Sequence, residues 1–370
     1  RGNRRIGAGA GHQRTAGWQG VKFGAVPTAE AAGCVLAHSI KLAGGTLKKG
    51  VVLGAADLQR LLEAGIDSVA VARLDAEDIA EDEAAMRVAR ALGGADADIG
   101  NAGTGRVNLY ARHAGLLMLD TARIHAANAV HEGLTVATLY AESPVEAGQM
   151  LATVKIIPYA VPRAALEAVL AALRGAAGPE TGRRALRVAA WKPVATGLVM
   201  TRTADTAATV LNKMREAVAG RLEPLGASLQ QEEIVPHDPA AVADALLRMV
   251  RRADAPQLLL VSGIAATVDR LDVVPAAMVM AGGRVVHAGM PVDPGNLLVL
   301  GELPGTTGLV PVVGIPTCAR SPKLNGFDFV LRRLVAGEPV TPAAIMAMGV
   351  GGLLTEIESR PMPRDPRRGG

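Results

Sequence analysis

Aromatic residues, cysteines and long apolar runs are all scarce in this chain. Phe, Trp and Tyr together make up 2% of the 370 residues, so the hydrophobic cores must consist mainly of Ala, Val and Leu. No apolar run reaches the roughly 18–20 residues that a membrane-spanning helix requires, and we expect no membrane association. The two cysteines, Cys34 and Cys318, lie far apart in the sequence. Such sparse cysteine usage is typical of a protein of the reducing cytoplasm.

A basic face that could bind nucleic acid is also missing. The formal net charge is +4, but residues 1–20 contribute +4 and residues 358–370 add +2, which leaves −2 for the rest of the chain. Domains that bind nucleic acid concentrate basic residues on a folded face, with aromatic residues nearby for stacking. We therefore expect no nucleic-acid partner.

The ends of the chain differ in composition from its middle. Residues 1–20 are rich in Gly and Arg, and they have neither an initiator Met nor the apolar core of a secretory signal peptide. This composition is typical of disorder. We interpret residues 1–20 as a disordered extension and residues 349–370 as a C-terminal tail.

Residues 21–95 are predicted to form a small α/β domain. Leu58 and Leu61 lie on one face of a helix, and Gly65 is suited to end that helix. A second helix is predicted over residues 75–92, with acidic residues early and arginines late, as the helix dipole favours.

Residues 96–180 are predicted to form a β-rich domain with a linker. Short apolar segments there alternate with turn residues. Pro162 fits the first turn of a helix over residues 163–174, because its missing N–H costs nothing at that position. The polar, Gly-rich stretch 175–184 is the clearest domain boundary.

Residues 186–348 alternate between strand and helix patterns. The continuous apolar run Leu258–Val261 is typical of a buried strand, and Asp238 with Pro239 is a strong helix start. Repeated βα units of this length predict a doubly wound, mostly parallel sheet with helices on both faces. The whole chain is thus predicted to be α/β, with the smaller α/β and β-rich domains preceding this one.

Three segments of this domain each join a predicted strand to a loop of Gly, Pro and polar residues. They are residues 258–275, 285–301 and 310–327. In an open parallel sheet such loops gather at the carboxyl ends of the strands, where ligands bind. We therefore expect the three segments to line one crevice.

The motifs in these segments resemble the molybdopterin-binding domain shared by the molybdopterin adenylyltransferase and molybdopterin molybdenumtransferase families. Ser262-Gly263, followed by Asp272 and Pro275, resembles the first motif of that domain. The segment Gly289–Gly295 resembles the second motif, and Gly314-Ile315-Pro316 resembles the third. The resemblance implies a Rossmann-like three-layer fold over residues 186–348. Parts of residues 31–66 are similar to accessory domains of the molybdenumtransferases.

The resemblance also implies a ligand and a set of binding residues. The ligand is molybdopterin, a pterin with a terminal phosphate, and the enzymes of the families also use Mg²⁺ with ATP or molybdate. Asp272 matches the family position beside the phosphate and metal, which implies a catalytic and metal-binding role, and Asp269 is a weaker second carboxylate. The cofactor-binding residues are predicted to be Ser262, Gly263, Thr267, Asp269, Pro294, Gly295, Asn296, Pro316, Arg320, Ser321, Lys323 and Asn325.

Each of these residues also has a purely structural interpretation. Asp272 is well placed to cap the helix that follows it. The sequence Asp293-Pro294-Gly295-Asn296 is typical of a tight turn, and the cations of the third segment can be solvated surface charge. Cys318 would be reactive beside Arg320 at a helix start, or inert if it is buried.

The function predicted from the sequence is that of a cytoplasmic molybdopterin-binding protein of molybdenum cofactor biosynthesis. If it is an enzyme, it transfers nucleotide or molybdate to molybdopterin with Mg²⁺. Ile264-Ala265-Ala266 replaces family loop residues, which favours the alternative of a non-catalytic carrier. A nucleotide pyrophosphohydrolase on the same domain is a third possibility. The families imply a homo-oligomer, with a molybdoenzyme or a cofactor-biosynthesis protein as partner.

Overall fold

The computed structural model describes residues 22–175 and 184–354. The predicted extension 1–20, most of the linker and most of the C-terminal tail therefore lie outside the described residues. The chain forms two compact units. The first runs to Val188 except for Ala114–Leu116, and that short piece belongs to the second unit together with the chain from Ala189 onward. The finer division of the first unit into domains stays a prediction.

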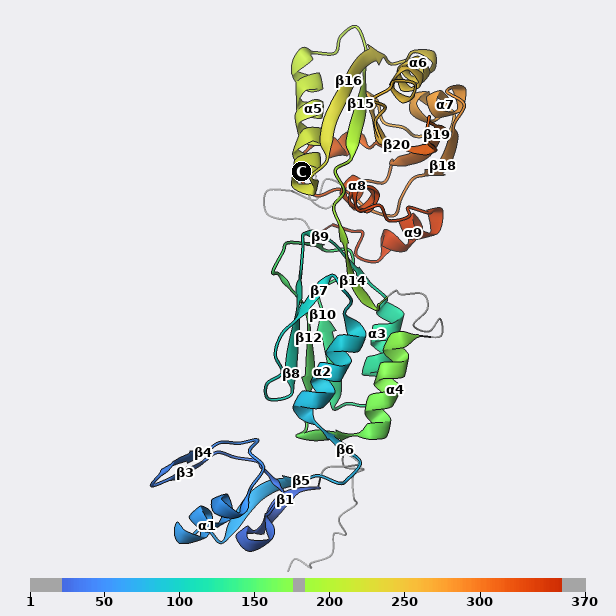
Figure 1. The fold of residues 1–370 in the computed structure, drawn as a ribbon. Coiled ribbons are helices and arrows are strands. Elements are labelled where there is room, and N and C mark those ends of the chain that lie inside the picture. The colour runs from blue at the N-terminus through green and yellow to red at the C-terminus, as the bar shows by residue number, and fades with distance from the viewer. Residues whose placement is uncertain (1–21, 176–183, 355–370) are drawn as a thin grey trace, which may run out of the picture. The chain divides into compact units, whose positions relative to one another are not determined.

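A small core of the first unit lies between helix α1 (Ala55–Glu63) and a sheet with strand order β1-β5-β2 (Figure 1). The Asp57 carboxylate accepts a hydrogen bond from the Gly54 N–H at 3.1 Å, which fixes the start of α1. Leu58 and Leu61 are buried on its inner face, as their spacing predicts. The strands of this part are β1 (Lys22–Pro27), β2 (Val35–Leu36), β3 (Ile40–Leu42), β4 (Gly45–Leu47) and β5 (Ser68–Arg73).

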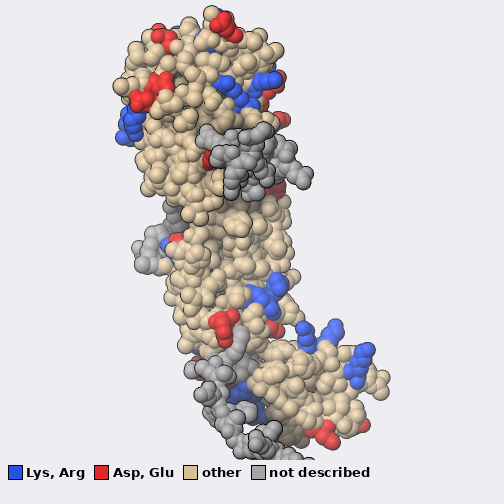
Figure 2. Space-filling model, turned by 180° about the vertical axis from the view of Figure 1, so that it is seen from behind, with Lys and Arg blue, Asp and Glu red and all other residues tan. Residues whose placement is uncertain are grey.

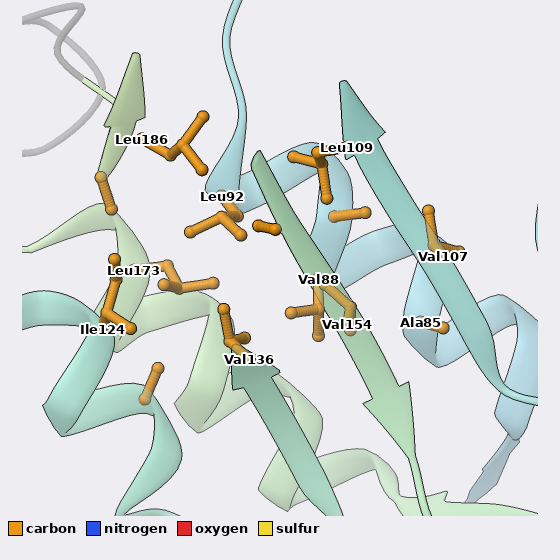
Figure 3. Close-up of a cluster of buried hydrophobic side chains, with 14 of the residues drawn as sticks. Ala85, Val88, Leu92, Val107, Leu109, Ile124, Val136, Val154, Leu173 and Leu186 are labelled. Atoms are coloured by element: carbon orange, nitrogen blue, oxygen red, sulfur yellow. The ribbon is translucent and has the colours of Figure 1, made fainter. Parts of the chain in front are cut away.

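A larger core of the first unit is formed by three helices and an antiparallel sheet with strand order β10-β12-β8-β7. Figure 3 shows Val154 of the sheet in the same buried cluster as Val88 of α2 and Leu173 of α4. Helix α2 packs on this sheet, although the sequence pattern groups it with the preceding residues. Helix α3 was not predicted, because Ile124 and Ala127 are its only buried residues.

The helices of this core are α2 (Glu81–Leu92), α3 (Thr121–Asn128) and α4 (Arg163–Arg174). The strands are β6 (Asp78–Ala80), β7 (Ala97–Ile99), β8 (Arg106–Ala111), β9 (Gly115–Leu119), β10 (Leu134–Thr138), β11 (Pro144–Val145), β12 (Met150–Ile156), β13 (Ala160–Pro162) and β14 (Leu186–Ala190). Of these, β9, β11 and β14 form a separate three-stranded sheet.

The second unit is built on a six-stranded sheet with strand order β16-β15-β17-β20-β19-β18. The first four of these strands pair in parallel, as predicted, but β19 is antiparallel to both of its neighbours. Only residues 305–308 separate β19 from β20. So short a connection cannot make the crossover that parallel neighbours need, so the sheet is mixed. Its strands are β15 (Ala195–Arg202), β16 (Ser228–Pro236), β17 (Leu258–Ser262), β18 (Arg284–Ala288), β19 (Val299–Pro304) and β20 (Leu309–Ile315).

Helices cover both faces of this sheet. Successive residues of a strand point to opposite sides, so Leu198 and Leu260 join one core while Val199 and Val261 join the other. Helices α5 and α8 complete the first core, and α6 and α7 complete the second. The helices of this unit are α5 (Ala208–Leu222), α6 (Pro239–Val250), α7 (Val273–Met280), α8 (Gly326–Ala336) and α9 (Pro342–Met346).

Charged side chains are spread thinly over the surface. On the face shown in Figure 2, small groups of Lys and Arg and of Asp and Glu are separated by wide uncharged areas. The part of the surface visible in that view therefore has no continuous basic area. Within residues 22–175 and 184–354, no helix combines the length and the apolar character needed to span a bilayer.

Candidate functional site

The carboxyl ends of the four parallel strands define the candidate site in the second unit. Strands β15, β16, β17 and β20 end at Arg202, Pro236, Ser262 and Ile315. Because these strands run in the same direction, the segments that follow them lie along one edge of the sheet. We refer to residues 262–272 as the first loop, 289–298 as the second loop and 316–325 as the third loop.

Two side chains that the sequence analysis did not select lie at the first loop: Thr201 bonds to it, and His237 bonds to Thr201. The Ile264 N–H donates to Thr201 Oγ1 at 2.8 Å, and Thr201 is fully buried at the end of β15. The same Oγ1 lies 2.9 Å from Nδ1 of His237, which directly follows β16. In the sequence, only their position could have indicated these residues, because both stand at the carboxyl end of a predicted parallel strand.

The first loop also offers free hydrogen-bond donors. No backbone acceptor in the described chain receives the N–H of Ala265, Ala266 or Thr267. These three consecutive groups follow a buried strand and precede α7. Successive unpaired N–H groups ahead of a helix are a favourable environment for an anion such as a phosphate.

The two carboxylates of the first loop stabilise its shape. Asp272 caps α7, because its Oδ1 accepts from the Val273 N–H at 2.8 Å and its Oδ2 from the Val268 N–H at 3.1 Å. Asp269 Oδ1 accepts from the Leu271 N–H at 2.7 Å. The observed hydrogen bonds of Asp272 therefore agree with its interpretation as a helix cap.

These carboxylates do not form a metal site by themselves. In the described part of the chain, no group of three or more His, Cys, Asp or Glu side chains is arranged to hold a metal ion. Both oxygens of Asp272 already accept backbone N–H groups. The donor set thus does not fit a Mg²⁺ site made from protein ligands, and the predicted metal role of Asp272 stays a prediction.

The second loop is fixed against the start of α8. The Pro294 carbonyl accepts from the Gly326 N–H at 2.8 Å, and a β-carbon at Gly295 would lie only 2.6 Å from that nitrogen. Gly295 has a φ of 141°, which disfavours any other residue. Asn296 is exposed, and its side chain reaches the Met290 carbonyl only at 3.5 Å.

Arg320 links the third loop to the first. It belongs to the short 3-10 helix Thr317–Arg320, and its Nη2 donates to the carbonyls of Gly263 at 2.9 Å and Ile264 at 2.7 Å. Burial lowers the pKa of its guanidinium. Its buried Nε has no hydrogen-bond partner in the described chain. Arg320 therefore holds the first loop in place, and its predicted contact with a ligand is untested.

The rest of the third loop is fixed by a buried ion pair that the sequence did not reveal. Arg221 of α5 lies 2.8 Å from Asp328 of α8, and their side chains are 7% and 11% exposed. Nη2 of Arg221 also donates to the carbonyls of Ser321 at 2.7 Å and Lys323 at 3.0 Å. The backbone of the loop is thereby held to both helices.

Asn325 is a structural residue in the observed fold. It is 1% exposed, and its Oδ1 accepts from the Phe327 N–H at 3.1 Å, so it caps α8. Its Nδ2 donates to Cys318 Sγ at 3.2 Å. Of the other predicted residues here, Pro316 is buried, whereas Ser321 is exposed and its Oγ accepts from the Lys323 N–H at 3.3 Å.

The first and second loops, together with Ala288 of β18 and Val299 of β19, line an open pocket of about 290 Å³. This volume is near the lower end of ordinary small-molecule pockets. The predicted residues Thr267 and Asp269 line it. The complete lining is Thr267, Val268, Asp269, Arg270, Ala288, Gly289, Leu297 and Val299. Two of the three loops therefore line the pocket, and Arg320 of the third loop is hydrogen-bonded to the first loop.

Comparison with known proteins gives limited matches. A domain family of unknown function (DUF8806) matches residues 25–73. Comparison with curated proteins gives no match. Among solved structures, the crystal structure of molybdenum cofactor biosynthesis protein B is similar, with 16% identity and a TM-score of 0.29, over 40% of this chain and 96% of that one.

Proposed function

We propose that the second unit binds molybdopterin, or its nucleotide form, between the first and second loops. The observation that carries this proposal is the row of unpaired N–H groups at residues 265–267, beside a pocket of about 290 Å³. Such groups suit the terminal phosphate of the ligand, because they donate to an anion without steric hindrance. The pocket between the loops then receives the pterin ring.

The identity of the ligand rests on the sequence motifs. Ser262-Gly263, Asp272 and Pro275 resemble the first motif of the molybdopterin-binding domain, in a loop that is one residue longer. The finer fold assignment, a doubly wound domain of that type, belongs to the same proposal. So do self-association, a cytoplasmic location and a cofactor-biosynthesis or molybdoenzyme partner.

We further propose that the unit binds its ligand without catalysing nucleotide or molybdate transfer. The bonds of Asp272 favour this carrier function over an enzymatic one, since both carboxylate oxygens serve the loop backbone. A catalytic Mg²⁺ would have to share those oxygens with the two backbone N–H groups. ATP and molybdate are not needed for the proposed binding.

The test is to mix the purified protein with molybdopterin, Mg-ATP and molybdate, and to separate bound from free pterin by gel filtration. We expect pterin to co-elute with the protein while neither AMP nor pyrophosphate is released. Release of AMP or pyrophosphate together with pterin binding would contradict the carrier function and support a transferase. Nucleotide hydrolysis without pterin binding would overturn the whole proposal in favour of a pyrophosphohydrolase.

A pair of variants tests the role of the backbone donors directly. Ala266→Pro removes one N–H of the row, whereas Ala266→Gly keeps it. We expect the proline variant to bind molybdopterin about tenfold more weakly and the glycine variant to bind it nearly as the wild type does. Equal binding by all three proteins would show that the phosphate lies elsewhere.

A further inference from the structure

His237 lies beside the first loop through two successive hydrogen bonds. Its Nδ1 is 2.9 Å from Thr201 Oγ1, and that oxygen accepts from the Ile264 N–H at 2.8 Å. A β-carbon at Gly263 would lie 3.8 Å from Cε1 of the imidazole, so the ring is adjacent to the loop glycine. The imidazole is therefore a near neighbour of the unpaired N–H groups at residues 265–267.

The second nitrogen of this imidazole is unused. No protein group in the described chain bonds to Nε2 of His237, and the residue is half-buried. Thr201 Oγ1 already accepts from Ile264, so its hydroxyl hydrogen can be donated to Nδ1. Nε2 then carries the ring proton, and it carries a proton in the imidazolium form as well.

We infer that His237 is a further ligand-binding residue, which donates from Nε2 to the anionic group held by the first loop. This inference rests on the proposed function. It adds a side-chain donor from the residue after β16 to a site so far made of backbone groups. It also gives the buried Thr201 a role, because Thr201 fixes both the imidazole and the loop in one orientation.

The charged residues next to His237 are Arg202, whose carbonyl accepts from the His237 N–H at 2.9 Å, and Asp238, which caps α6. Arg320 reaches Gly263 from the third loop. The N–H at Nε2 of His237 adds a donor beside the anion, so binding is expected to weaken when the imidazole is removed.

The experiment uses sulfate as the probe, because sulfate is a tetrahedral anion like phosphate. Isothermal titration calorimetry of the full chain at pH 7 measures its affinity. We expect the wild type to bind sulfate about tenfold more tightly than a variant without the imidazole. The His237→Asn variant keeps an oxygen acceptor for the Thr201 hydroxyl but lacks the Nε2 donor, and we expect it to bind sulfate only weakly.

The matched control is His287→Asn in β18, which should behave as the wild type does. Equal sulfate binding by the wild type and His237→Asn would overturn the inference, and so would the absence of sulfate binding by the wild type. Molybdopterin binding that His237→Asn leaves unchanged would also overturn it while leaving the proposed function intact. Sulfate binding that depends on His237, in a protein that does not bind molybdopterin, would contradict the proposed function alone.

Discussion

The first and third loops use their charged residues for different purposes. In the third loop, the sequence contains two cations and an amide that suit a phosphate, yet Arg320 donates to the first loop and Asn325 caps α8. In the first loop, which has no comparable cluster of cations, consecutive backbone N–H groups remain unpaired. Thus the third loop, whose side chains would suit a phosphate, holds the first loop in place. The first loop, which lacks such side chains, provides the unpaired N–H groups.

Removal of the buried ion pair that anchors the third loop should have the largest effect on stability. Arg221→Met leaves the Asp328 carboxylate buried without its partner, and we expect a loss of about 3 kcal/mol in the free energy of unfolding of the second unit. Urea titration can follow this unit through Trp191, which packs against its core, in a Trp18→Phe background.

The control on the same helix is Arg215→Met. Its pair with Glu232 is exposed and spans 3.9 Å, so a loss of about 0–1 kcal/mol is expected. Similar losses for both variants would mean that the buried pair is not what holds the third loop.

The link between the two loops can be broken separately. Arg320→Met removes the donors to the carbonyls of Gly263 and Ile264, each bond being worth about 1.5–3 kcal/mol when the donor is charged. We expect exchange of the hydrogen-bonded Ile264 and Val268 N–H groups to accelerate at least about tenfold. Arg270→Met, in the exposed part of the first loop, should leave exchange unchanged, and acceleration by both variants would contradict the link.

Asp272 provides a smaller effect within the first loop. Asp272→Ala removes the cap of α7 and should lower the free energy of unfolding of the second unit by about 1 kcal/mol. Asp272→Asn keeps one oxygen acceptor, for the Val273 N–H, and should restore part of it. If Asn restores stability but abolishes a Mg²⁺-dependent turnover that the wild type shows, the carboxylate has a metal-binding role after all.

The smallest effect is expected for Glu81 at the start of α2. In the described chain its carboxylate makes no bonds of the kind that Asp272 makes. Burial raises its pKa, although Lys155 acts in the opposite direction. The folded state thus binds the proton more tightly than the unfolded state, so its stability falls as the pH rises through the interval above the usual pKa of Glu. Glu81→Gln should remove this fall.

All three tyrosines, Tyr110, Tyr140 and Tyr159, belong to the first unit, so near-ultraviolet circular dichroism can follow its thermal unfolding against pH. A difference between the wild type and Glu81→Gln that does not change with pH would mean that Glu81 ionises in the folded state as it does in the unfolded chain.

Local signals in the sequence predicted much of the fold. Helix α4 was predicted with its observed bounds, because Pro162 marks its start. The antiparallel β19 was not anticipated, since its apolar pattern is the same in either direction and the short turn at residues 305–308 decides it.

The candidate site was predictable only in part. The sequence placed the loops along the sheet edge, but the partners of their side chains are set by contacts between distant residues. Arg221 and Asp328 are 107 residues apart, and Thr201 and Ile264 are 63 apart. No periodicity or local motif encodes such pairs, so the roles of Arg320 and His237 could not be read from spacing.

The close packing of Gly295 on Gly326 has a kinetic consequence. This backbone contact joins the second loop to the first turn of α8, and the Arg221 ion pair joins α8 to α5. We therefore expect the second loop to move only together with α5 and α8. If the pocket binds the proposed ligand, we expect the rate of its entry and exit to depend on how often the first loop releases Thr201.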